Sequence, residues 1–445
     1  MTRPFPFHEI SPWVDSPADL QPPLEDDLDT DVVIVGGGYT GLSAALALRA
    51  QGADVAVLEQ RFAGSGSSGR NAGHLTPTIG KDIPTLLRVF GRERASTLLR
   101  FADAAVEFAE ETIRKHGIDC EYAPTGNLLA AVHPKQERAL RRATAIASEL
   151  GAAVRFLTGE DLRARGVPPS FLCGAFEERG GHLHPGLYVM GLRAAALEAG
   201  VRLFEHSTLE TLEAGPRVVA RTQRGSVRAD SAVLATNAYT VQTGWMARRV
   251  APLAVSLFRT EPLAPDRRAA LDWRGREGVY TAHQVLESYR LTAEGRVVGG
   301  SRTVRAGWGR RLPALYDPRA FRLVERAFRQ RFPELGTVEV DGFWSGWIGF
   351  TLDFLPALGV GGPHRNVHHG IGFAGHGVAQ ATLVGAMLAE RVQGREHSWE
   401  HALRRRLLGW PPEPLRWVGG KLLIGVLEGL DRRTDRQIQK LRSGA

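Results

Sequence analysis

The chain has 445 residues, which is enough for two domains or for one elaborate α/β unit with a large core. Apolar residues make up 43% of it and charged residues 23%, so the composition is that of a globular protein and excludes a disordered chain. The net charge is +8, but arginine is spread along the chain instead of clustering with aromatic residues, so we expect solvated surface and no nucleic-acid binding.

The two cysteines, Cys120 and Cys173, stand apart from any CxxC motif or Cys/His cluster, and they predict neither a disulfide framework nor a zinc site. The first residues lack the basic and apolar regions of a signal peptide, and no run of about 18 apolar residues suggests a transmembrane helix. We therefore expect a cytoplasmic protein with no transmembrane segment and no bound metal. Residues 1–30, rich in proline and acids, are expected to form an arm on the first domain.

The most informative pattern lies at residues 31–59. An apolar strand ends at Gly36, Gly38 and Gly41, a helix begins there, and a second strand ends at Glu59. The glycines allow a tight turn, close approach to a pyrophosphate and packing of helix on strand, while the helix N-terminus offers N–H groups and a positive dipole. Glu59 can accept hydrogen bonds from both ribose hydroxyls. A lone GxGxxG is a weak signal, but the complete unit predicts dinucleotide binding.

The following segment, residues 64–80, is too polar and too rich in glycine for a buried element. Apolar residues with helical spacing follow at 84–115 and 134–150. A helix pattern within 186–204 runs into a strand, and a further strand is expected at 231–235.

The second half of the chain begins with strand-forming pieces separated by turns, which favours an antiparallel sheet. These pieces lie at 251–260, 279–291 and 296–300, and strand character returns at 339–350. Residues 370–377, GIGFAGHG, then open an apolar helix. Two glycine-to-helix units with a sheet between them predict a discontinuous nucleotide-binding domain that is interrupted by a substrate domain. This layout is typical of a flavoprotein and not of a simple NAD dehydrogenase.

Seven motifs stand in order along the chain: PLEDDLDTDVVIVGGGYTGLSAA (23–45), GSGSSGRNAGH (64–74), LHPGLYVMGL (183–192), VLATNAYT (233–240), SYRLTAEGRVVGG (288–300), WSGWIGFTLDFLPALG (344–359) and GFAGHGV (372–378). Together they resemble the flavin-dependent amine oxidase superfamily that includes D-amino-acid, glycine and sarcosine oxidases. Within it the chain is most similar to the gamma-glutamylputrescine oxidase subgroup. The resemblance extends to about residue 395.

The resemblance implies an α/β fold, with a Rossmann-like FAD-binding domain of the glutathione-reductase-2 type and an interleaved α+β substrate domain built on an antiparallel sheet. It also implies FAD and the oxidation of a C–N bond to an imine by hydride transfer to flavin N5. The expected boundaries are 1–82, 151–250 and 341–398 for the FAD-binding domain, 83–150 and 251–340 for the substrate domain, and 399–445 for a C-terminal helical tail.

The cofactor-binding residues implied by the resemblance lie in the first glycine turn, the loop after the second strand, the adenine and later turns, and the last glycine turn. They are Gly36, Gly38, Tyr39, Thr40, Gly41, Glu59, Gln60, Ser67, Ser68, Arg70, Asn71, Gly73, His74, Leu209, Thr236, Asn237, Gly375, His376, Gly377 and Val378. Hydroxyls and backbone N–H groups of residues 67–71 suit a pyrophosphate, with Arg70 supplying charge. The helix that begins at Gly375–Val378 would stabilise negative charge on the flavin pyrimidine ring.

The predicted catalytic residues are His74, Tyr289, Arg290 and Trp347, and substrate handling is also expected of His283, Glu287 and Trp344. Aromatic faces suit an amine or its cationic tail, and Glu287 is expected to pair with a second ammonium of a polyamine. Tyr289 and Arg290 have a plain alternative, since alternating strand residues often only cover a sheet. His74 and His376 likewise have the alternative of bonding a loop carbonyl or of simply beginning a helix.

Two positions depart from the family pattern. In this superfamily, oxidases of free α-amino acids hold the carboxylate with an arginine placed just before the Thr-x-Asp motif, where this chain has Ile348. Isoleucine cannot replace a bidentate guanidinium, so a D-amino acid or glycine held in that way is disfavoured. Gly346 stands where sarcosine oxidases carry the flavin-linking cysteine, so we expect noncovalent FAD.

The electron acceptor and the partners stay open at this point. Some relatives use a lysine to assist O₂ reduction, but lysine is absent between residues 136 and 420, so O₂ or another acceptor can reoxidise the flavin. The alternatives are a flavin monooxygenase reduced by NAD(P)H and a flavoprotein subunit that acts only with partners. The basic tail at 411–445 resembles an interfacial helix, although such a helix more often packs on the enzyme or at a subunit contact, and an oligomer stays open.

Overall fold

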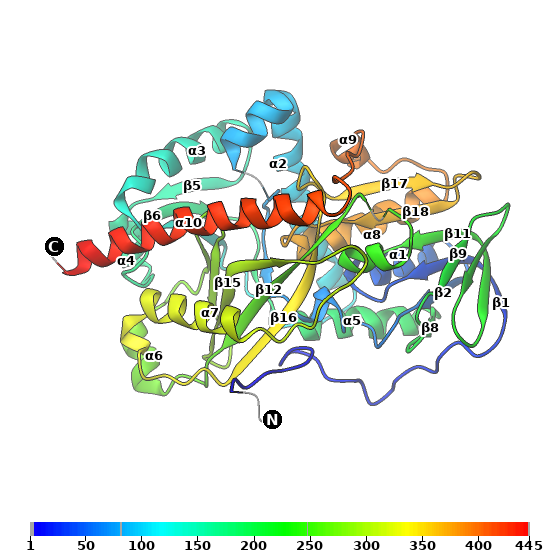
Figure 1. Ribbon diagram of the computed structural model, residues 1–445, viewed down its shortest axis with the longest axis horizontal. Helices are drawn as coiled ribbons and strands as arrows, with labels where there is room; N and C mark the ends of the chain where they lie inside the picture. Colours follow the sequence, from blue (N-terminus) through cyan, green and yellow to red (C-terminus); the bar gives the residue numbers. More distant parts are fainter. Residues whose placement is uncertain (1–3, 81, 247, 444–445) are drawn as a thin grey trace.

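The computed structural model describes residues 4–80, 82–246 and 248–443, and in this part of the chain the strands form two large sheets and one short two-stranded pair. Figure 1 shows the first sheet, with β1, β2, β8 and β18, on the right and the second sheet, with β12 and β15, towards the left. The short pair consists of β3 (His74–Leu75) and β7 (Gly181–His182).

The first sheet is a parallel sheet with antiparallel additions. Its strand order is β17 (Ala357–Gly361), β18 (Val367–Ile371), β11 (Ser226–Leu234), β1 (Leu28–Val35), β2 (Val55–Leu58) and β8 (Arg202–Phe204), and β10 (Val218–Arg221) joins β11 to β9 (Thr211–Glu213). β18, β11, β1, β2 and β8 run parallel. Val33 and Ile34 are fully buried on opposite faces of β1, as expected for a parallel sheet covered on both sides. The predicted strand–helix–strand unit at 31–59 is confirmed.

The second sheet is mostly antiparallel, as predicted. Its order is β16 (Gly342–Phe350), β12 (Ala251–Arg259), β15 (Val297–Ala306), β14 (Glu287–Leu291), β13 (Gly278–Thr281), β4 (Asn127–Ala131), β6 (Cys173–Glu177) and β5 (Val154–Leu157). One pair is parallel, β13 with β4.

The helices that the sequence predicts are present as α1 (Tyr39–Ala50), α2 (Ile83–Lys115), α3 (Glu137–Glu149), α5 (Pro185–Glu198), α8 (Gly377–Val392) and α10 (Leu415–Ser443). Further helices that were not predicted from the sequence are α4 (Gly159–Ala164), α6 (Pro265–Leu271), α7 (Pro318–Arg331) and α9 (Glu400–Leu403). α1 packs against α8 and α5, which places the two glycine-to-helix turns side by side. Within the described residues, no helix has the length and apolar character needed to cross a bilayer.

Two predicted domain boundaries cut through the second sheet. β5 and β6 lie in the segment 151–250 that was assigned to the FAD-binding domain, and β16 lies in 341–398, yet all three strands pair in the second sheet. β6 pairs with β4 along its whole length, and β16 pairs with β12 over nine residues. These pairings join residues far apart in the chain, so the composition of the single strands could not reveal them.

The prediction that residues 64–80 are unsuited to burial is wrong. Gly64, Arg70 and His74 are buried, and the segment winds between the two sheets. Burial is tolerated because the polar groups of the segment are paired, for example through the Asn71 side chain, which donates to the Ser68 carbonyl and accepts from Gly73 N–H at 2.7 and 2.8 Å.

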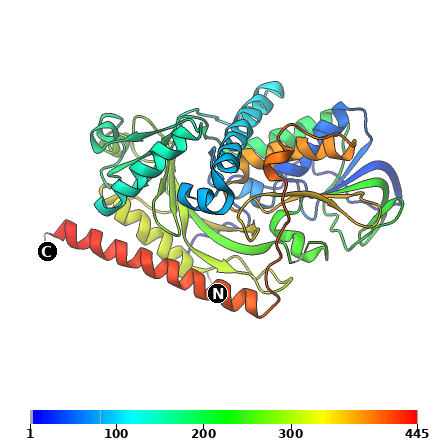
Figure 2. The ribbon, with the colours of Figure 1, turned by 90° about the horizontal axis from the view of Figure 1, so that it is seen from above.

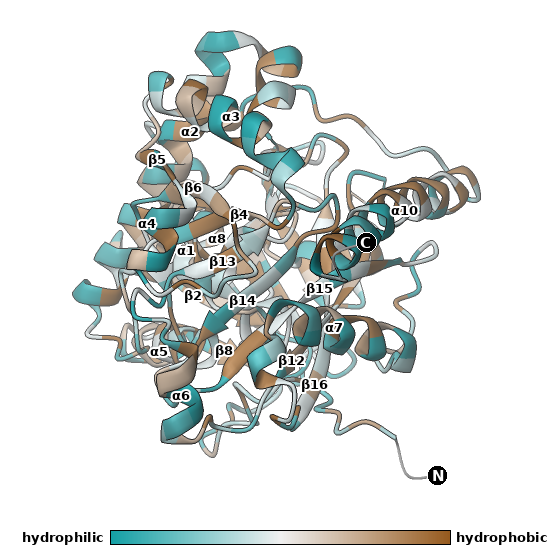
Figure 3. Ribbon diagram, turned by 90° about the vertical axis from the view of Figure 1, so that its left-hand side faces the viewer, coloured by the Kyte–Doolittle hydropathy of each residue, from teal (hydrophilic) through white to brown (hydrophobic). Residues whose placement is uncertain are grey.

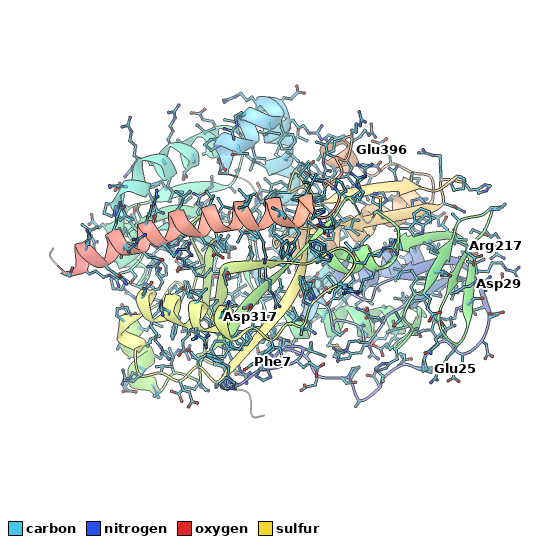
Figure 4. The ribbon with its side chains drawn as sticks, viewed as in Figure 1. Phe7, Glu25, Asp29, Arg217, Asp317 and Glu396 are labelled. Atoms are coloured by element: carbon cyan, nitrogen blue, oxygen red, sulfur yellow. The ribbon has the colours of Figure 1, made fainter. Side chains whose placement is uncertain are left out.

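The N-terminal arm lies on the molecule as expected, but it reaches both sheets; residues 1–3 lie outside the described residues. Phe343 of β16 exchanges backbone hydrogen bonds with Pro6 and His8. Further along, Trp13 Nε1 donates to the carbonyl of Asn71 at 3.0 Å, so the arm covers the loop after β2. At the beginning of β1, Asp29 pairs with Arg217; Figure 4 labels both side chains.

The C-terminal tail is helical, as predicted, up to the last described residue. α10 runs along one edge of the molecule in Figure 2, and Figure 3 shows it beside α7. Asp435 of α10 pairs with Arg331 of α7 at 2.8 Å. On the outward side of α10, apolar side chains such as Leu422 and Val426 stay exposed. The tail therefore packs on the enzyme through the ion pairs of Asp435 and the buried side chain of Ile438; residues 444–445 lie outside the described residues.

Candidate active site

A cavity of about 1370 Å³ runs between the two sheets and under α10. One end is lined by Gly36, Gly38 and Glu59, and the middle by the buried loop 64–80 and the start of α8. The far end is lined by α3 and α10, mainly with alanine, leucine and isoleucine side chains. The cavity thus joins the predicted dinucleotide site to a separate apolar chamber.

The first end of the cavity is shaped by the turn between β1 and α1. Gly36 has φ +109°, a conformation that favours glycine, and a Cβ on Gly38 would lie 2.8 Å from Ser68 Oγ. Glu59 accepts hydrogen bonds from Gly37 N–H at 2.8 Å and from Arg61 N–H at 3.1 Å, and burial raises the pKa of its carboxyl. The remaining lone pairs of Glu59 face the cavity, as ribose binding requires.

The loop after β2 forms the next wall. Ser67 Oγ donates to the Trp347 carbonyl at 2.6 Å, which ties the loop to β16. Arg70 donates from Nε and Nη1 to the carbonyls of Ser65, Glu9, Ile10 and Ser345 at 2.8–3.0 Å. Its guanidinium is thus largely occupied in holding the arm, the loop and β16 together, in addition to lining the cavity.

The start of α8 faces the cavity without a side-chain cap. Gly375, His376, Gly377 and Val378 line the cavity here, so the first N–H groups of the helix are free to meet a ligand. Among the described residues, His376 has no hydrogen-bond partner for either ring nitrogen, and burial lowers its pKa to about 4. Two uncapped helix starts, an acid at the ribose position and a glycine-lined approach between them fit FAD.

His74 lies in the middle of the cavity. Its Nδ1 is 3.3 Å from Asn127 Oδ1, and its ring centroid is 4.9 Å from that of Tyr280. The Nε2 atom is buried without a hydrogen-bond partner among the described residues. Burial, with a smaller effect from the charge of Arg290, lowers the pKa of His74 to about 3, so the imidazole is neutral at pH 7. A neutral imidazole with a free nitrogen can exchange a hydrogen bond with a ligand.

Most of the predicted cofactor residues line this cavity. They are Gly36, Gly38, Tyr39, Thr40, Glu59, Gln60, Ser67, Ser68, Arg70, Asn71, His74, Leu209, Thr236, Asn237, Gly375, His376, Gly377 and Val378. Gly41 and Gly73 do not line it. A Cβ on Gly41 would lie 1.9 Å from the Gly36 carbonyl oxygen, so this glycine serves the packing of α1 on the turn. Gly73 has φ +83° and lies against the Leu183 carbonyl.

Two predicted catalytic residues, Tyr289 and Arg290, do not line the cavity, whereas His74 and Trp347 do. The Tyr289 hydroxyl donates to Glu287 at 3.2 Å, and its ring packs against Phe332 in the core of the second sheet. Arg290 donates from Nε to the Ala72 carbonyl and supports the loop. The Tyr289 side chain is thus engaged inside the protein, whereas Arg290 Nη2 is buried without a hydrogen-bond partner among the described residues, and contact of these side chains with the substrate stays a prediction.

The other residues expected to handle the substrate divide in the same way. His283 lines the cavity, and Trp344 is fully buried with Nε1 donating to the Arg70 carbonyl at 2.8 Å. Glu287 is fully buried and pairs with Arg331 at 2.8 Å and with Arg302 at 3.4 Å. Because its charge is already balanced, the prediction that Glu287 holds a second ammonium is wrong.

The groups of His283, Glu287 and Asp435 that could hold a metal lie within 4.8 Å of one another. Asp435 also pairs with Arg331 and Arg302, at 2.8 and 2.6 Å. Two guanidinium groups therefore already supply the positive charge that these acids need. We interpret the cluster as an ion-pair network that docks α10 on the second sheet.

The positions that depart from the family pattern both reach the cavity. Ile348 and Gly346 line it, and Ile348 Cδ1 lies 3.5 Å from where a Cβ of Gly375 would be. Arg70 and Arg416 also line it, but Arg70 is bonded to backbone carbonyls and Arg416 to Glu413. Each guanidinium that lines the cavity within the described residues is thus already hydrogen-bonded, and neither is free to bind a substrate carboxylate in bidentate fashion.

Sequence reasoning missed several cavity residues. Thr76, Asp103, Glu177 and Tyr280 line the cavity beside His74, and the inner side of α10 closes its far end. Glu177 is the last residue of β6, and an acid at the end of an apolar strand is a signal that could have been used. Asp103 lies within α2, and nothing in its local sequence distinguishes it from a surface acid.

Comparisons with known proteins agree with this geometry. A family model described as "FAD dependent oxidoreductase" (DAO) matches residues 31–391. Gamma-glutamylputrescine oxidoreductase of Escherichia coli K12 is 32% identical over 374 residues, which cover 83% of this chain and 85% of that protein. Among solved structures, glycine oxidase from Geobacillus kaustophilus superposes with a TM-score of 0.72 at 21% identity, covering 86% of this chain and 100% of that one. L-proline dehydrogenase from P. horikoshii gives 0.69 at 21% identity, covering 84% and 96%.

Proposed function

Because this chain belongs to the DAO family of FAD-dependent oxidoreductases, we propose that it oxidises the C–N bond of a primary or secondary amine to an imine. The observation that carries the choice of an amine over an amino acid is the side chain of Ile348 at the cavity wall. An arginine there could bind a carboxylate in bidentate fashion, and isoleucine cannot. The name of the Escherichia coli relative supports an amine of the gamma-glutamylputrescine kind.

The residues that would hold FAD are Glu59 at the ribose, Ser67–Asn71 at the pyrophosphate and the start of α8 at the flavin ring. When bound, FAD supplies the acceptor for the hydride that leaves the carbon next to the nitrogen. We propose that FAD is held without a covalent bond, since Gly346 has no side chain to form one and neither Cys120 nor Cys173 lines the cavity.

The chain's own residues prepare the amine for this step. His74, neutral at pH 7, can accept a hydrogen bond from the amine N–H at Nε2 and so orient it. Trp347 and Ile348 contribute apolar wall, which excludes water and favours the uncharged form of the amine that the reaction requires. O₂ or another acceptor would then take the electrons. Lys135 lines the cavity. The lysine that assists O₂ reduction in some relatives falls in the part of this chain that has no lysine.

The test is to record the visible spectrum of the purified holoenzyme anaerobically while amines are added. The panel is gamma-glutamylputrescine, putrescine, butylamine, sarcosine and D-alanine. We expect the flavin band to bleach with amines whose reacting nitrogen has no carboxylate on the adjacent carbon, such as gamma-glutamylputrescine, putrescine and butylamine, and not with D-alanine. If no amine bleaches the band and NADPH does, the proposal fails and a monooxygenase is favoured. Bleaching only after another protein is added would favour a partner-dependent subunit.

A further inference from the structure

An acidic site lies in the cavity beside His74. Glu177, at the end of β6, accepts a hydrogen bond from Thr76 Oγ1 at 2.7 Å, and both residues line the cavity. Asp103 of α2 also lines the cavity. Burial and the charge of Asp103 raise the pKa of Glu177 to about 7, against the opposing effect of the hydrogen bond from Thr76.

Within the described residues, neither acid of this site has a salt-bridge partner. Among the described residues, no lysine or arginine side chain forms an ion pair with Glu177 or Asp103, in contrast to Glu287 with its two arginines. The charge of Arg179 opposes the rise in the pKa of Asp103 that burial causes, but the Arg179 side chain itself pairs with Glu107 at the surface. Two acids that face a cavity without a cation are costly to ionise, and a bound cation would remove that cost.

A second observation places a ligand here. His74 is 9% exposed, and its Nε2 has no hydrogen-bond partner in the described part of the chain, although it faces the same cavity. Tyr280 lies between His74 and Glu177. Its ring centroid is 4.9 Å from that of His74, and burial, with a smaller effect from the charge of Glu177, raises the pKa of the Tyr280 hydroxyl. Asn127, whose Oδ1 lies 3.3 Å from His74 Nδ1, is the strand partner of Glu177, so the imidazole and the acid lie at neighbouring positions.

We propose that Glu177, with Asp103 beside it, binds a second cationic group of the substrate, so that the enzyme prefers diamines to monoamines. The reacting amine lies at His74, and a chain of a few carbons separates it from the distal ammonium at Glu177. This inference rests on the proposed amine oxidation and adds a determinant of substrate class. We assign an organic ammonium and not a metal ion to the site, since the group of described residues with the geometry to hold a metal is that of His283, Glu287 and Asp435.

The experiment compares Glu177→Gln with the wild-type holoenzyme. Gln keeps the shape and the hydrogen bond from Thr76 but removes the charge. We expect the concentration of putrescine that half-bleaches the flavin to rise at least tenfold, while that of butylamine changes less than about twofold, since charge-assisted hydrogen bonds contribute about 1.5–3 kcal/mol. Glu178→Gln is the matched control, because Glu178 is exposed and pairs with Arg155, and it should alter neither value.

A binding measurement separates this inference from the proposed function. Putrescine should raise the thermal midpoint of wild-type holoenzyme, and this shift should be lost in Glu177→Gln and kept in Glu178→Gln. If wild-type flavin is bleached by both amines and Glu177→Gln leaves their ratio and the thermal shift unchanged, the cation site is refuted while amine oxidation stands. If no amine bleaches wild-type flavin, amine oxidation fails, and the thermal shift alone decides the cation site. Asp103→Asn, measured in the same way, replaces Glu177→Gln if that variant does not fold.

Discussion

At the residue scale, burial acts in opposite directions on the groups that face the cavity. It lowers the pKa of His74 to about 3, so that its imidazole is uncharged at neutral pH, and it raises the pKa of Glu177 to about 7. In both cases the low dielectric disfavours the charged form. The cavity therefore favours a neutral amine at His74, and a cation bound beside Glu177 would favour ionisation of its carboxyl.

Glu59 is the residue whose loss should affect the cofactor most directly. Glu59→Ala removes the acceptor for the Gly37 and Arg61 N–H groups as well as for the ribose, so we expect protein that is largely free of FAD and less stable by about 1–3 kcal/mol. Glu59→Gln keeps one acceptor oxygen and should retain more FAD. The ratio of flavin absorbance to protein absorbance after purification measures the effect.

The control for this pair is Glu210→Ala, at an exposed position near the first sheet, which should retain full FAD. Stoichiometric flavin in Glu59→Ala would contradict the assignment of the ribose site to Glu59.

At the element scale, α10 is held by two aspartates on its inner side. Asp431 accepts hydrogen bonds from the backbone N–H groups of Gln284 and Val285 at 2.8 and 2.9 Å. One turn further on, Asp435 pairs with Arg331 and Arg302. Since residues of α10 also line the cavity, these contacts position one of its walls.

Asp435→Asn should loosen α10. Burial alone would raise the pKa of Asp435, but the hydrogen bond with His283 and the charges of Arg331 and Arg302 hold it well below its usual range. A carboxyl whose pKa is lower in the folded state stabilises the protein above its unfolded pKa of about 3.9 and loses this contribution as the pH falls further. We expect Asp435→Asn to cost about 3 kcal/mol at pH 7, as for a broken buried ion pair, with the difference shrinking below about pH 4.

Thermal unfolding between pH 3 and pH 8 checks this prediction. Asp230→Asn is the control, because Asp230 forms an exposed pair with Arg217 and should change stability by less than about 1 kcal/mol. An unchanged thermal midpoint for Asp435→Asn at pH 7 would show that α10 docks without this network.

At the scale of the whole molecule, the cavity lies where the two sheets meet. The loop 64–80, the start of α8 and β16 all line it, so the bound cofactor would contact both sheets at once. The N-terminal arm, through Trp13 and the carbonyls bonded to Arg70, supports the same loop from outside. FAD should therefore stabilise the entire chain, and not the first sheet alone.

Removal of FAD tests this expectation. Denaturation should release all flavin into solution, because no side chain is placed to bind it covalently. The apoprotein should unfold at a lower temperature, and free FAD at about 100 times its Kd should restore about 2.7 kcal/mol. Riboflavin, which lacks the adenosine expected at Glu59, should stabilise much less. Flavin that stays with the denatured protein would contradict noncovalent binding.

Local patterns predicted the nucleotide half of the site well. The glycine turn after β1, Glu59 after β2 and the turn before α8 place their groups through backbone geometry within a few residues, and all of them line the cavity. The substrate half was predicted less well. All five residues of β14 are buried, so the alternation that normally separates the two faces of a strand gives no sign of which side faces the cavity. This is why Glu287 and Tyr289 were assigned to the substrate although they lie in the core.

By itself, then, the sequence determined the family, the FAD-binding turns and the order of the elements. These depend on short-range spacing and on backbone conformations that favour glycine. Only the tertiary structure decided which strands join the second sheet, which arginines are already paired, and that Glu177 and Asp103 line the cavity of His74 without a salt-bridge partner among the described residues. Such facts depend on contacts between residues far apart in the chain. Whether an acid is available to a substrate is decided by its neighbours in space: Glu287 is buried against two arginines, whereas Glu177 lines the cavity.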